Sequence, residues 1–321
     1  MVYLNKMTLK HDIQQKALEL GFDTIGFALP SIKLNNQNRL DQMIKKGEFA
    51  TMAWIADRSN ILKNPKQIWP HVQSIIVLGI NYKPNQRIIE NALAYDHHST
   101  NGYISIYARH KDYHNVVKKK LKQLSNWLIN HFQCQATYYV DTAPVMEKAI
   151  ASQSGLGWQG KNTCIITREF GSFIFLGEIF TSLFIEPNQP QQNECGNCQL
   201  CMEACPTGAI YKPYHLDPRK CISYLTIEHK QSIPNEFYPA IRNRIYGCDT
   251  CQLVCPYNQS GPETKEEAFI AKHHLINPDL LEFLKYDENK FNDIFAGSPI
   301  KRIGFERFMR NVVIALINIT K

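Results

Sequence analysis

Two cysteine runs constrain this chain of 321 residues more than any other feature. The first run reads Cys195-x2-Cys198-x2-Cys201-x3-Cys205-Pro206, and the second reads Cys248-x2-Cys251-x3-Cys255-Pro256. Such short spacings let several thiolates from one tight loop reach one iron–sulfur cubane, and the proline keeps the following helix from removing the last ligand. The runs therefore predict two 4Fe–4S clusters in a ferredoxin-like segment.

A count of ligands divides the cysteines between the two clusters. In two-cluster ferredoxins the fourth cysteine of such a run binds the other cluster. The first cluster then takes Cys195, Cys198, Cys201 and Cys255. The second takes Cys248, Cys251 and Cys205, and lacks one ligand. We assign Cys221 as the eighth ligand because it alone of the spare cysteines lies inside the segment. Cys134 and Cys164 are expected to be buried, inert thiols.

Zinc is the competing interpretation of these cysteines. Zinc sites usually repeat Cys-x2-Cys pairs at a wider separation, so the three-step runs with Cys-Pro favour iron–sulfur clusters. The chain has 10 cysteines but begins with no apolar export signal, and it contains no run of 18 apolar residues. We therefore expect a cytoplasmic protein without a membrane span, whose thiols are kept reduced as metal ligands.

Hydrophobic periodicity and turn residues divide the chain into three segments. Residues 1–185 should form a domain that mixes helices and strands around one sheet. Residues 186–262 begin with a polar connector and hold the cysteine runs, and residues 263–321 form a helical end. Expected strands cover residues 22–29, 74–82, 136–140, 163–167 and 172–181; expected helices cover 8–20, 36–46, 112–132, 144–154 and 305–319.

A glycine-rich loop at Gly155-Leu-Gly157-Trp-Gln-Gly160-Lys161-Asn162 imitates nucleotide-binding motifs. Those motifs need a strand before the glycines and a helix after them, so that a phosphate meets a helix N-terminus. Here the order is reversed, and Asn162 lacks the hydroxyl that would hold magnesium. We reject nucleotide binding and expect the glycines to allow a tight turn or a close approach to another flat cofactor.

Asp141 has two interpretations. It ends the apolar run TYYVD and precedes Pro144. A carboxylate at this position can cap the following helix, and its pKa would then be low. It is equally the best candidate for an acid in the first domain. A general acid has to carry its proton near neutral pH, so that role requires a raised pKa.

The formal net charge is +7, and basic residues gather in two places. One group is Arg109, Lys111, Lys118, Lys119, Lys120 and Lys122; the other is Lys301, Arg302, Arg307 and Arg310. Such groups suit a polyanionic partner such as nucleic acid, but they also suit a solvated helix face. The charge alone does not decide between the two.

Several motifs together resemble the epoxyqueuosine reductases. They are Asp112-Tyr113-His114, Val140 to Val145, Gly155 to Trp158, Gly160 to Thr163, Cys221 in KCISYLTIE, and Tyr246 to Asp249. The resemblance implies an α+β fold. A nitroreductase-like, cobalamin-binding domain would precede a two-cluster ferredoxin-like domain and a short HEAT-like helical segment. It also implies reduction of epoxyqueuosine to queuosine at the wobble position of tRNA, with electrons passing through two 4Fe–4S clusters to cobalamin.

The resemblance also assigns roles to residues. It places the proton donor on Asp141, and it places Arg58, Ser223, Gly247, Cys248 and Asp249 near cobalamin. The partners that it implies are tRNA carrying epoxyqueuosine and an external low-potential electron donor, and we expect a monomer. Two departures stand out. Lys148 replaces the arginine of the family, which loses the planar fork for bidentate contacts, and many members continue further into the helical tail.

Three other functions fit parts of the pattern. A cobalamin-dependent reductive dehalogenase would share both kinds of cofactor. An electron-transfer iron–sulfur protein would need only the clusters, although residues 1–185 exceed what an electron carrier requires. A tRNA-binding module with structural clusters is the third. Binding of a corrinoid, and activity on modified tRNA, would separate these functions.

Overall fold

A four-stranded antiparallel sheet lies at the centre of the first part of the chain. The computed structural model describes residues 6–94 and 100–320; residues 1–5, which belong to the first predicted segment, lie outside it. The strand order is β1 (Thr24–Ala28), β2 (Ser74–Asn81), β7 (Ile174–Thr181) and β4 (Ala136–Tyr139). All residues of β2 are buried. Its continuous apolar sequence suits a central strand that is covered on both faces.

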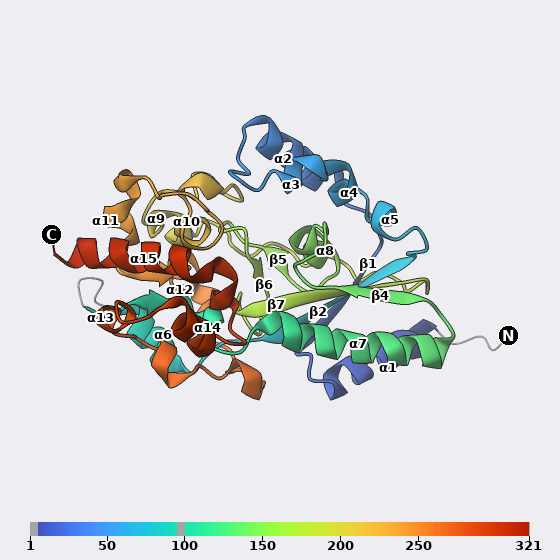
Figure 1. Cartoon of the computed structure of the whole chain (residues 1–321). Coiled ribbons are helices and arrows are strands. Elements are labelled where there is room, and N and C mark those ends of the chain that lie inside the picture. The colour runs from blue at the N-terminus through green and yellow to red at the C-terminus, as the bar shows by residue number, and fades with distance from the viewer. Residues whose placement is uncertain (1–5, 95–99, 321) are drawn as a thin grey trace.

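Helices cover the two faces of this sheet unequally (Figure 1). The long helix α7 (Tyr113–Phe132) and α1 (Lys6–Glu19) pack on one face, where Val117 and Leu121 are fully buried. Burial of each such side chain stabilises the fold by about 2 kcal/mol. Asp112 caps α7 by accepting the His114 N–H at 3.0 Å, a contact worth about 1 kcal/mol. The short helix α8 (Glu147–Gln153) packs on the opposite face.

A second core contains the end of the chain together with one early segment. Strand β3 (Tyr103–Ile104) pairs in parallel with β8 (Arg244–Tyr246). Ile104 and Ala108 belong to the same buried cluster as Phe291 and Phe308. The helices of this cluster are α13 (Leu280–Phe283), α14 (Glu288–Ile294) and α15 (Gly304–Ile319). The chain therefore crosses from the sheet into the second core and back before it reaches the cysteine runs.

The remaining elements are short. An arm at the top of Figure 1 consists of α2 (Leu34–Lys45), α3 (Trp54–Asp57), α4 (Ser59–Lys63) and α5 (Pro65–Ile68). A small hairpin consists of β5 (Trp158–Gln159) and β6 (Ile165–Ile166). The other helices are α6 (Gln86–Leu93), α9 (Leu200–Glu203), α10 (Ile222–Ile227), α11 (Tyr238–Ile241) and α12 (Thr250–Leu253).

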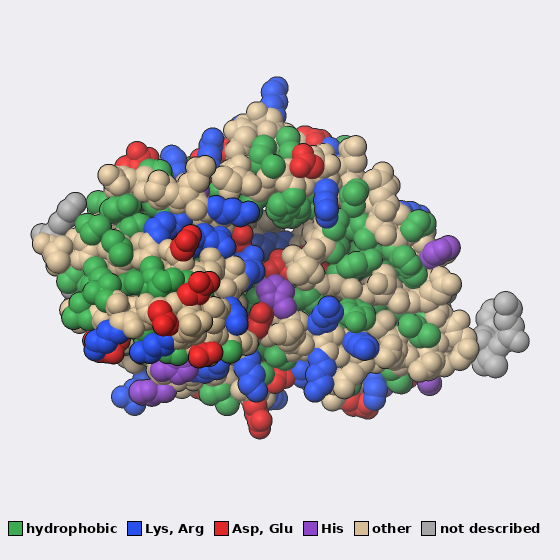
Figure 2. All heavy atoms as spheres, viewed as in Figure 1, with side chains coloured by type: hydrophobic (Ala, Val, Ile, Leu, Met, Phe, Trp, Pro, Cys, Tyr) green, Lys and Arg blue, Asp and Glu red, His purple; other side chains and the backbone are tan. Residues whose placement is uncertain are grey.

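The surface is hollowed near the middle of the face seen in Figure 2, between the arm and the sheet. Lys and Arg side chains lie along the edge of this hollow. Within the described part of the chain, no helix is both long enough and apolar enough to cross a membrane.

Candidate active site and cysteine ligands

Four thiols surround one cavity of about 230 Å³. They belong to Cys195, Cys198, Cys201 and Cys255. The Cys255 thiol lies within electrostatic range of the other three, and burial together with these neighbours raises the pKa of Cys255 to about 11. Iron bound here must therefore displace thiol protons, because only thiolates are ligands.

A second group of thiols forms beside the first. Cys221 lies close to Cys248 and Cys205, and Cys251 lies close to Cys248 and Cys221. Burial raises the pKa of Cys221 to about 11. These four thiols are the ones that the ligand count gives to the second cluster, and their division between two clusters stays a prediction. Among the described residues, no group of three or more His, Cys, Asp or Glu side chains has an arrangement that could hold a single metal ion.

Cys164 lies closer to these thiols than its expected role as an inert core residue suggested. It is half-buried, and its thiol lies near both Cys251 and Cys201. The neighbouring Asn162 explains this position. Its side chain accepts the Cys164 N–H at 3.1 Å and donates to the Cys251 carbonyl at 3.3 Å.

The glycine-rich loop supports the cysteine loops. Lys161 Nζ donates to the carbonyls of Gly196 and Cys198 at 2.7 and 2.8 Å. Gly157 allows the β5–β6 hairpin to close, since a Cβ there would lie 2.3 Å from the Ile166 carbonyl oxygen. Of the two expected uses of the glycines, the structure displays the tight turn. Lys161 is bound to backbone rather than open to a phosphate.

Asp141 lies in an exposed turn and caps no helix. Strand β4 ends at Tyr139, and Asp141 has a left-handed backbone with φ of 50°. The predicted helix from residue 144 begins only at Glu147, and its N-cap is Met146, which makes no side-chain cap. The N-cap interpretation is therefore wrong. The turn replaces the first predicted helical turn, and it leaves the Asp141 side chain 57% exposed.

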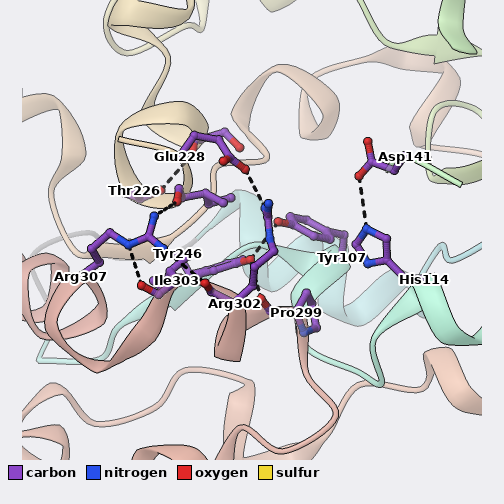
Figure 3. A network of polar contacts seen from close by, with 12 residues as sticks. Tyr107, His114, Asp141, Thr226, Glu228, Tyr246, Pro299, Arg302, Ile303 and Arg307 are labelled. Carbon is purple, nitrogen blue, oxygen red and sulfur yellow. Dashed lines mark hydrogen bonds and ion pairs between the residues drawn. The ribbon is translucent and has the colours of Figure 1, made fainter. Parts of the chain in front are cut away.

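Helix α7 holds the Asp141 carboxylate from the other side of the turn. Tyr113 donates its hydroxyl to Asp141 Oδ2 at 2.5 Å. His114 Nε2 lies 3.4 Å from the same oxygen (Figure 3). The other ring nitrogen of His114 lies 2.7 Å from the Asp112 carboxylate. The N–H of Asp141 donates to Glu147 Oε1 at 2.6 Å. Two consecutive residues of α7 thus orient one exposed acid.

The electrostatics of this pair contradict the expectation of a raised pKa at Asp141. The hydrogen bond from His114 lowers the pKa of Asp141 to about 2, against the opposing effect of burial. Burial alone would lower the pKa of His114, but the carboxylates of Asp112 and Asp141 raise it to about 9. At neutral pH the proton of this pair therefore sits on His114, and Asp141 is ionised.

Arg302 joins the end of the chain to this site. Its guanidinium lies 2.7 Å from Glu228 Oε1, and its charge also lowers the pKa of Asp141 after the stronger effects of His114 and Tyr113 (Figure 3). Beside it, the Tyr246 hydroxyl donates to the Pro299 carbonyl at 3.1 Å. In sequence Arg302 belongs to the second basic group, and its ion pair could not be predicted because Glu228 lies 74 positions away.

The expected cofactor contacts lie on different elements. Arg58 is exposed between α3 and α4, and Ser223 is half-buried on α10. Gly247 has φ of 73° and precedes Cys248, an expected cluster ligand. Asp249 is buried, and its carboxylate accepts three hydrogen bonds. The donors are the Tyr103 hydroxyl, the Ser105 hydroxyl and the Ile106 N–H, at 2.8, 2.5 and 2.7 Å. The Asp249 side chain therefore ties β3 to the cysteine loop.

The two basic groups are only partly available to a partner. Arg109 is buried and donates to the Ile104 carbonyl, so it belongs neither to a solvated helix face nor to a surface that a polyanion could reach. Lys120 pairs with Glu266 at 2.8 Å. Arg310 donates to the carbonyls of Leu225, His229 and Gln231. The lysines that stay exposed are Lys111, Lys118, Lys119, Lys122 and Lys301.

Two family models match the chain. Residues 194–258 match a 4Fe-4S double cluster binding domain, which contains every predicted cluster ligand. Residues 63–142 match the model described as epoxyqueuosine reductase QueG, DUF1730, and this match ends just after Asp141.

Curated proteins and solved structures are similar over nearly the whole chain. The epoxyqueuosine reductase of Salmonella typhimurium is 40% identical over 97% of this chain and 80% of its own length. That of Escherichia coli is 39% identical over 98% and 82%. A crystal structure of epoxyqueuosine reductase with an epoxyqueuosine-modified tRNA-Tyr stem loop superposes with a TM-score of 0.90 at 30% identity, covering 98% of this chain and 82% of that one. The Bacillus subtilis enzyme, solved with a catalytic aspartate loop swung out of the active site, gives 0.87 at 29%, with the same coverage.

Proposed function

This chain belongs to the epoxyqueuosine reductase family and is an oxidoreductase, and we propose that it reduces epoxyqueuosine in tRNA to queuosine with the help of cobalamin. One observation carries the proposal: the whole described fold is similar to an enzyme solved with an epoxyqueuosine-modified tRNA stem loop. The substrate is then a tRNA, which sets the cytoplasm as the site of action. An external low-potential donor supplies the electrons, and the protein acts as a monomer.

The reaction consumes two electrons and two protons. Both carbon–oxygen bonds of the epoxide break, a carbon–carbon double bond forms, and the oxygen leaves as water. The departing oxygen needs a proton at the moment its bonds break, because an alkoxide is a poor leaving group. Asp141 is the proposed donor, since its carboxyl is exposed and is aimed by Tyr113 and His114.

The ion pair supplies that proton by transfer from His114. In the open site the proton sits on His114 and Asp141 is ionised. A substrate that covers the turn excludes water and so disfavours the charged forms of both groups. The proton then moves to Asp141, which becomes a neutral acid beside the epoxide. A low pKa in the open site is compatible with an acid role in the closed one.

The thiol groups fit the role of electron carriers. Residues 186–262 would hold one cluster on Cys195, Cys198, Cys201 and Cys255 and a second on Cys205, Cys221, Cys248 and Cys251. Such clusters reach the low potentials that the reaction needs. Lys161 and Asn162 hold the two cysteine loops in place by donating hydrogen bonds to backbone carbonyls, one in each loop. Residues 1–185 would bind substrate and cofactor, with 263–321 as the helical end.

Cobalamin would bind where the arm approaches the cysteine loops, and two contacts support this placement. Thr51 of the arm reaches across to Tyr224 of α10, with the two hydroxyls 2.7 Å apart. Cys248 packs in the same cluster as Met52. Arg58, Ser223 and Cys248 therefore belong to elements that meet at this crossing, and we propose that they hold cobalamin. Cobalamin, when bound, supplies a strongly reducing cobalt centre.

The test is conversion of the modified nucleoside. The protein is reconstituted anaerobically with iron, sulfide and cobalamin, and is mixed with epoxyqueuosine-containing tRNA and a strong reductant. Mass spectrometry of the nucleosides should show loss of one oxygen atom, and only when cobalamin is present. No conversion by protein that holds both clusters and cobalamin would overturn the proposed reaction. Conversion without cobalamin would overturn the proposed cofactor.

A further inference from the structure

A buried glutamate lies behind the Asp141 turn. Glu178 is in the middle of β7, directly opposite Tyr139 of β4 and Val77 of β2, and none of its surface is exposed. Neither carboxylate oxygen has a hydrogen-bond donor among the described residues. An isolated charge in such a place costs several kcal/mol, so a glutamate in this strand should be neutral or share a proton.

Glu147 is the neighbour that can share a proton with it. Glu147 begins α8, which packs on the same face of the sheet as Glu178 and Phe180. Glu178 thus faces α8, and an electrostatic interaction joins its carboxyl group to that of Glu147. Both are acceptors when ionised, so a hydrogen bond between them requires a proton on one of them. Burial raises the pKa of Glu147 to about 7 and that of Glu178 well above its usual range.

Glu147 also holds the backbone of the catalytic turn. Its Oε1 accepts the Asp141 N–H at 2.6 Å. Asp141 is not a glycine, and its left-handed backbone needs such support because an L side chain disfavours a φ of 50°. A second contact sets the other end of the turn, where Val145 donates to the Ala143 carbonyl at 2.8 Å. Glu147 thus connects the pair to Asp141, the proposed acid.

The charges that face the pair come from three elements. Asp141 of the turn adds a negative charge, Lys148 of α8 adds a positive one, and Tyr113 of α7 adds a phenol that stays neutral. With one proton, the pair carries a single negative charge beside Lys148. Loss of that proton would put two carboxylates in the core next to ionised Asp141, and like charges at this range repel strongly.

We propose that Glu147 and Glu178 form a proton-sharing pair that latches the Asp141 turn and so positions the acid for the reaction. The importance of this latch for turnover rests on the proposed function, but the latch itself does not. While the pair holds its proton, Glu178 fixes Glu147, and Glu147 fixes the Asp141 backbone. When the pair loses the proton, the repulsion among the three carboxylates releases the turn. Glu147 and Glu178 are positioning residues that act through Asp141.

The first test needs no turnover. In the protein without added cofactors, the amide proton of Asp141 is followed by NMR as pH rises. In the wild type its downfield shift, caused by the short hydrogen bond to Glu147, should persist through pH 7, where the first of the pair's two protons leaves, and should disappear only well above pH 7, as the second proton leaves. In Glu178→Gln the shift should persist, because the glutamine amide donates to Glu147 at every pH. Glu147→Gln serves the same purpose if Glu178→Gln does not fold, since its oxygen still accepts the Asp141 N–H.

A matched control is Asp23→Asn. Asp23 is another carboxyl whose pKa burial raises, and it accepts the Asn81 N–H at 2.7 Å, away from the turn. This variant should retain the wild-type response of the Asp141 amide. A wild-type amide that ignores pH would overturn the latch, as would a response in Glu178→Gln with the wild-type midpoint.

Turnover then separates the latch from the proposed reaction. With the reconstituted enzyme, Glu178→Ala should lower kcat about tenfold or more with little change in KM, because misplacement of a reacting group by a fraction of an ångström has this effect. Glu178→Gln should restore most of the rate. Equal rates in Glu178→Ala and the wild type would overturn the positioning role. If neither the wild type nor any variant converts epoxyqueuosine while the NMR titration gives the expected result, the latch is supported and the proposed reaction is overturned.

Discussion

His114 Nε2 lies 3.4 Å from the Asp141 carboxylate, and this contact decides where the proton of the candidate active site resides. The two residues come from α7 and from the turn after β4, which are joined only in the folded chain. Each raises the stability of the charged form of the other, so the open site holds an ion pair rather than a neutral acid.

The pH dependence of kcat/KM should follow His114. This ratio reports groups of the free enzyme. His114 keeps its proton up to about pH 9, so kcat/KM should be flat through neutral pH and fall above pH 9. His114→Asn should lower kcat/KM by about 10²-fold and remove the alkaline fall. His131→Asn, an exposed histidine later on the same helix, is the control and should behave as the wild type. An alkaline fall that survives in His114→Asn would assign it to another group.

The melting temperature should depend on the protonation of Glu147 and Glu178. The pKa of Glu147 is raised in the folded state, to about 7 from an ordinary 4.5. The stability that comes from its proton is fully present below about pH 4.5 and is lost as pH rises through about 7. The melting temperature should therefore fall between these values. Glu178→Gln should flatten that fall, whereas Asp23→Asn should keep it. A wild-type melting temperature that is constant over this range would contradict the raised pKa.

Replacing Cys221, the proposed eighth cluster ligand, should abolish the binding of one cluster. Cys221 belongs to the group with Cys205, Cys248 and Cys251, so Cys221→Ser should bind about half the iron of the wild type after reconstitution. Cys134→Ser should bind the full amount, because Cys134 lies near the Leu128 carbonyl, outside both groups. Iron and sulfide analysis checks both variants. Full iron in Cys221→Ser would mean that the second cluster draws its fourth ligand from elsewhere, and Cys164 would be the next to test.

Binding of tRNA should depend on the lysines of α7 that face solvent. Lys118, Lys119 and Lys122 are exposed. Replacing all three by alanine should weaken binding and reduce the slope of log Kd against log salt by as much as about 3. Lys285→Ala removes a charge that is paired with Glu282 and should change little. An unchanged slope in the triple variant would place the phosphate contacts on another surface.

Local patterns predicted much of the fold. The apolar run at residues 74–82 and the long amphipathic run after Asp112 correspond to β2 and α7, because periodicity and capping act within one segment. The cysteine count also groups residues that are far apart in sequence, since cluster chemistry restricts which thiols join, and this grouping stays a prediction. The chemistry of Asp141 did not follow from its neighbours in sequence. It depends on Tyr113 and His114, 28 and 27 positions earlier in the chain.

The same limit applies to the other residues that the sequence analysis missed. Arg109 looked like part of a basic surface, but the pairing of β3 with β8 draws its segment into the second core. Glu178 looked like one polar position in an apolar strand. Only the packing of α8 on β7 brings Glu147 to it and connects both to the Asp141 turn. The surroundings of these residues depend on contacts between segments that are distant in sequence, so no local pattern predicts them.

The most direct test of the account is the Asp141→Asn variant, reconstituted with iron, sulfide and cobalamin and compared with the wild type on epoxyqueuosine-containing tRNA. Asparagine keeps the size of the side chain and can still accept from Tyr113, but it cannot donate an acid proton. The variant should bind both clusters and cobalamin in wild-type amounts and lose at least about 10²-fold in the rate of conversion to queuosine. A rate equal to that of the wild type in a fully loaded variant would remove Asp141 from the mechanism.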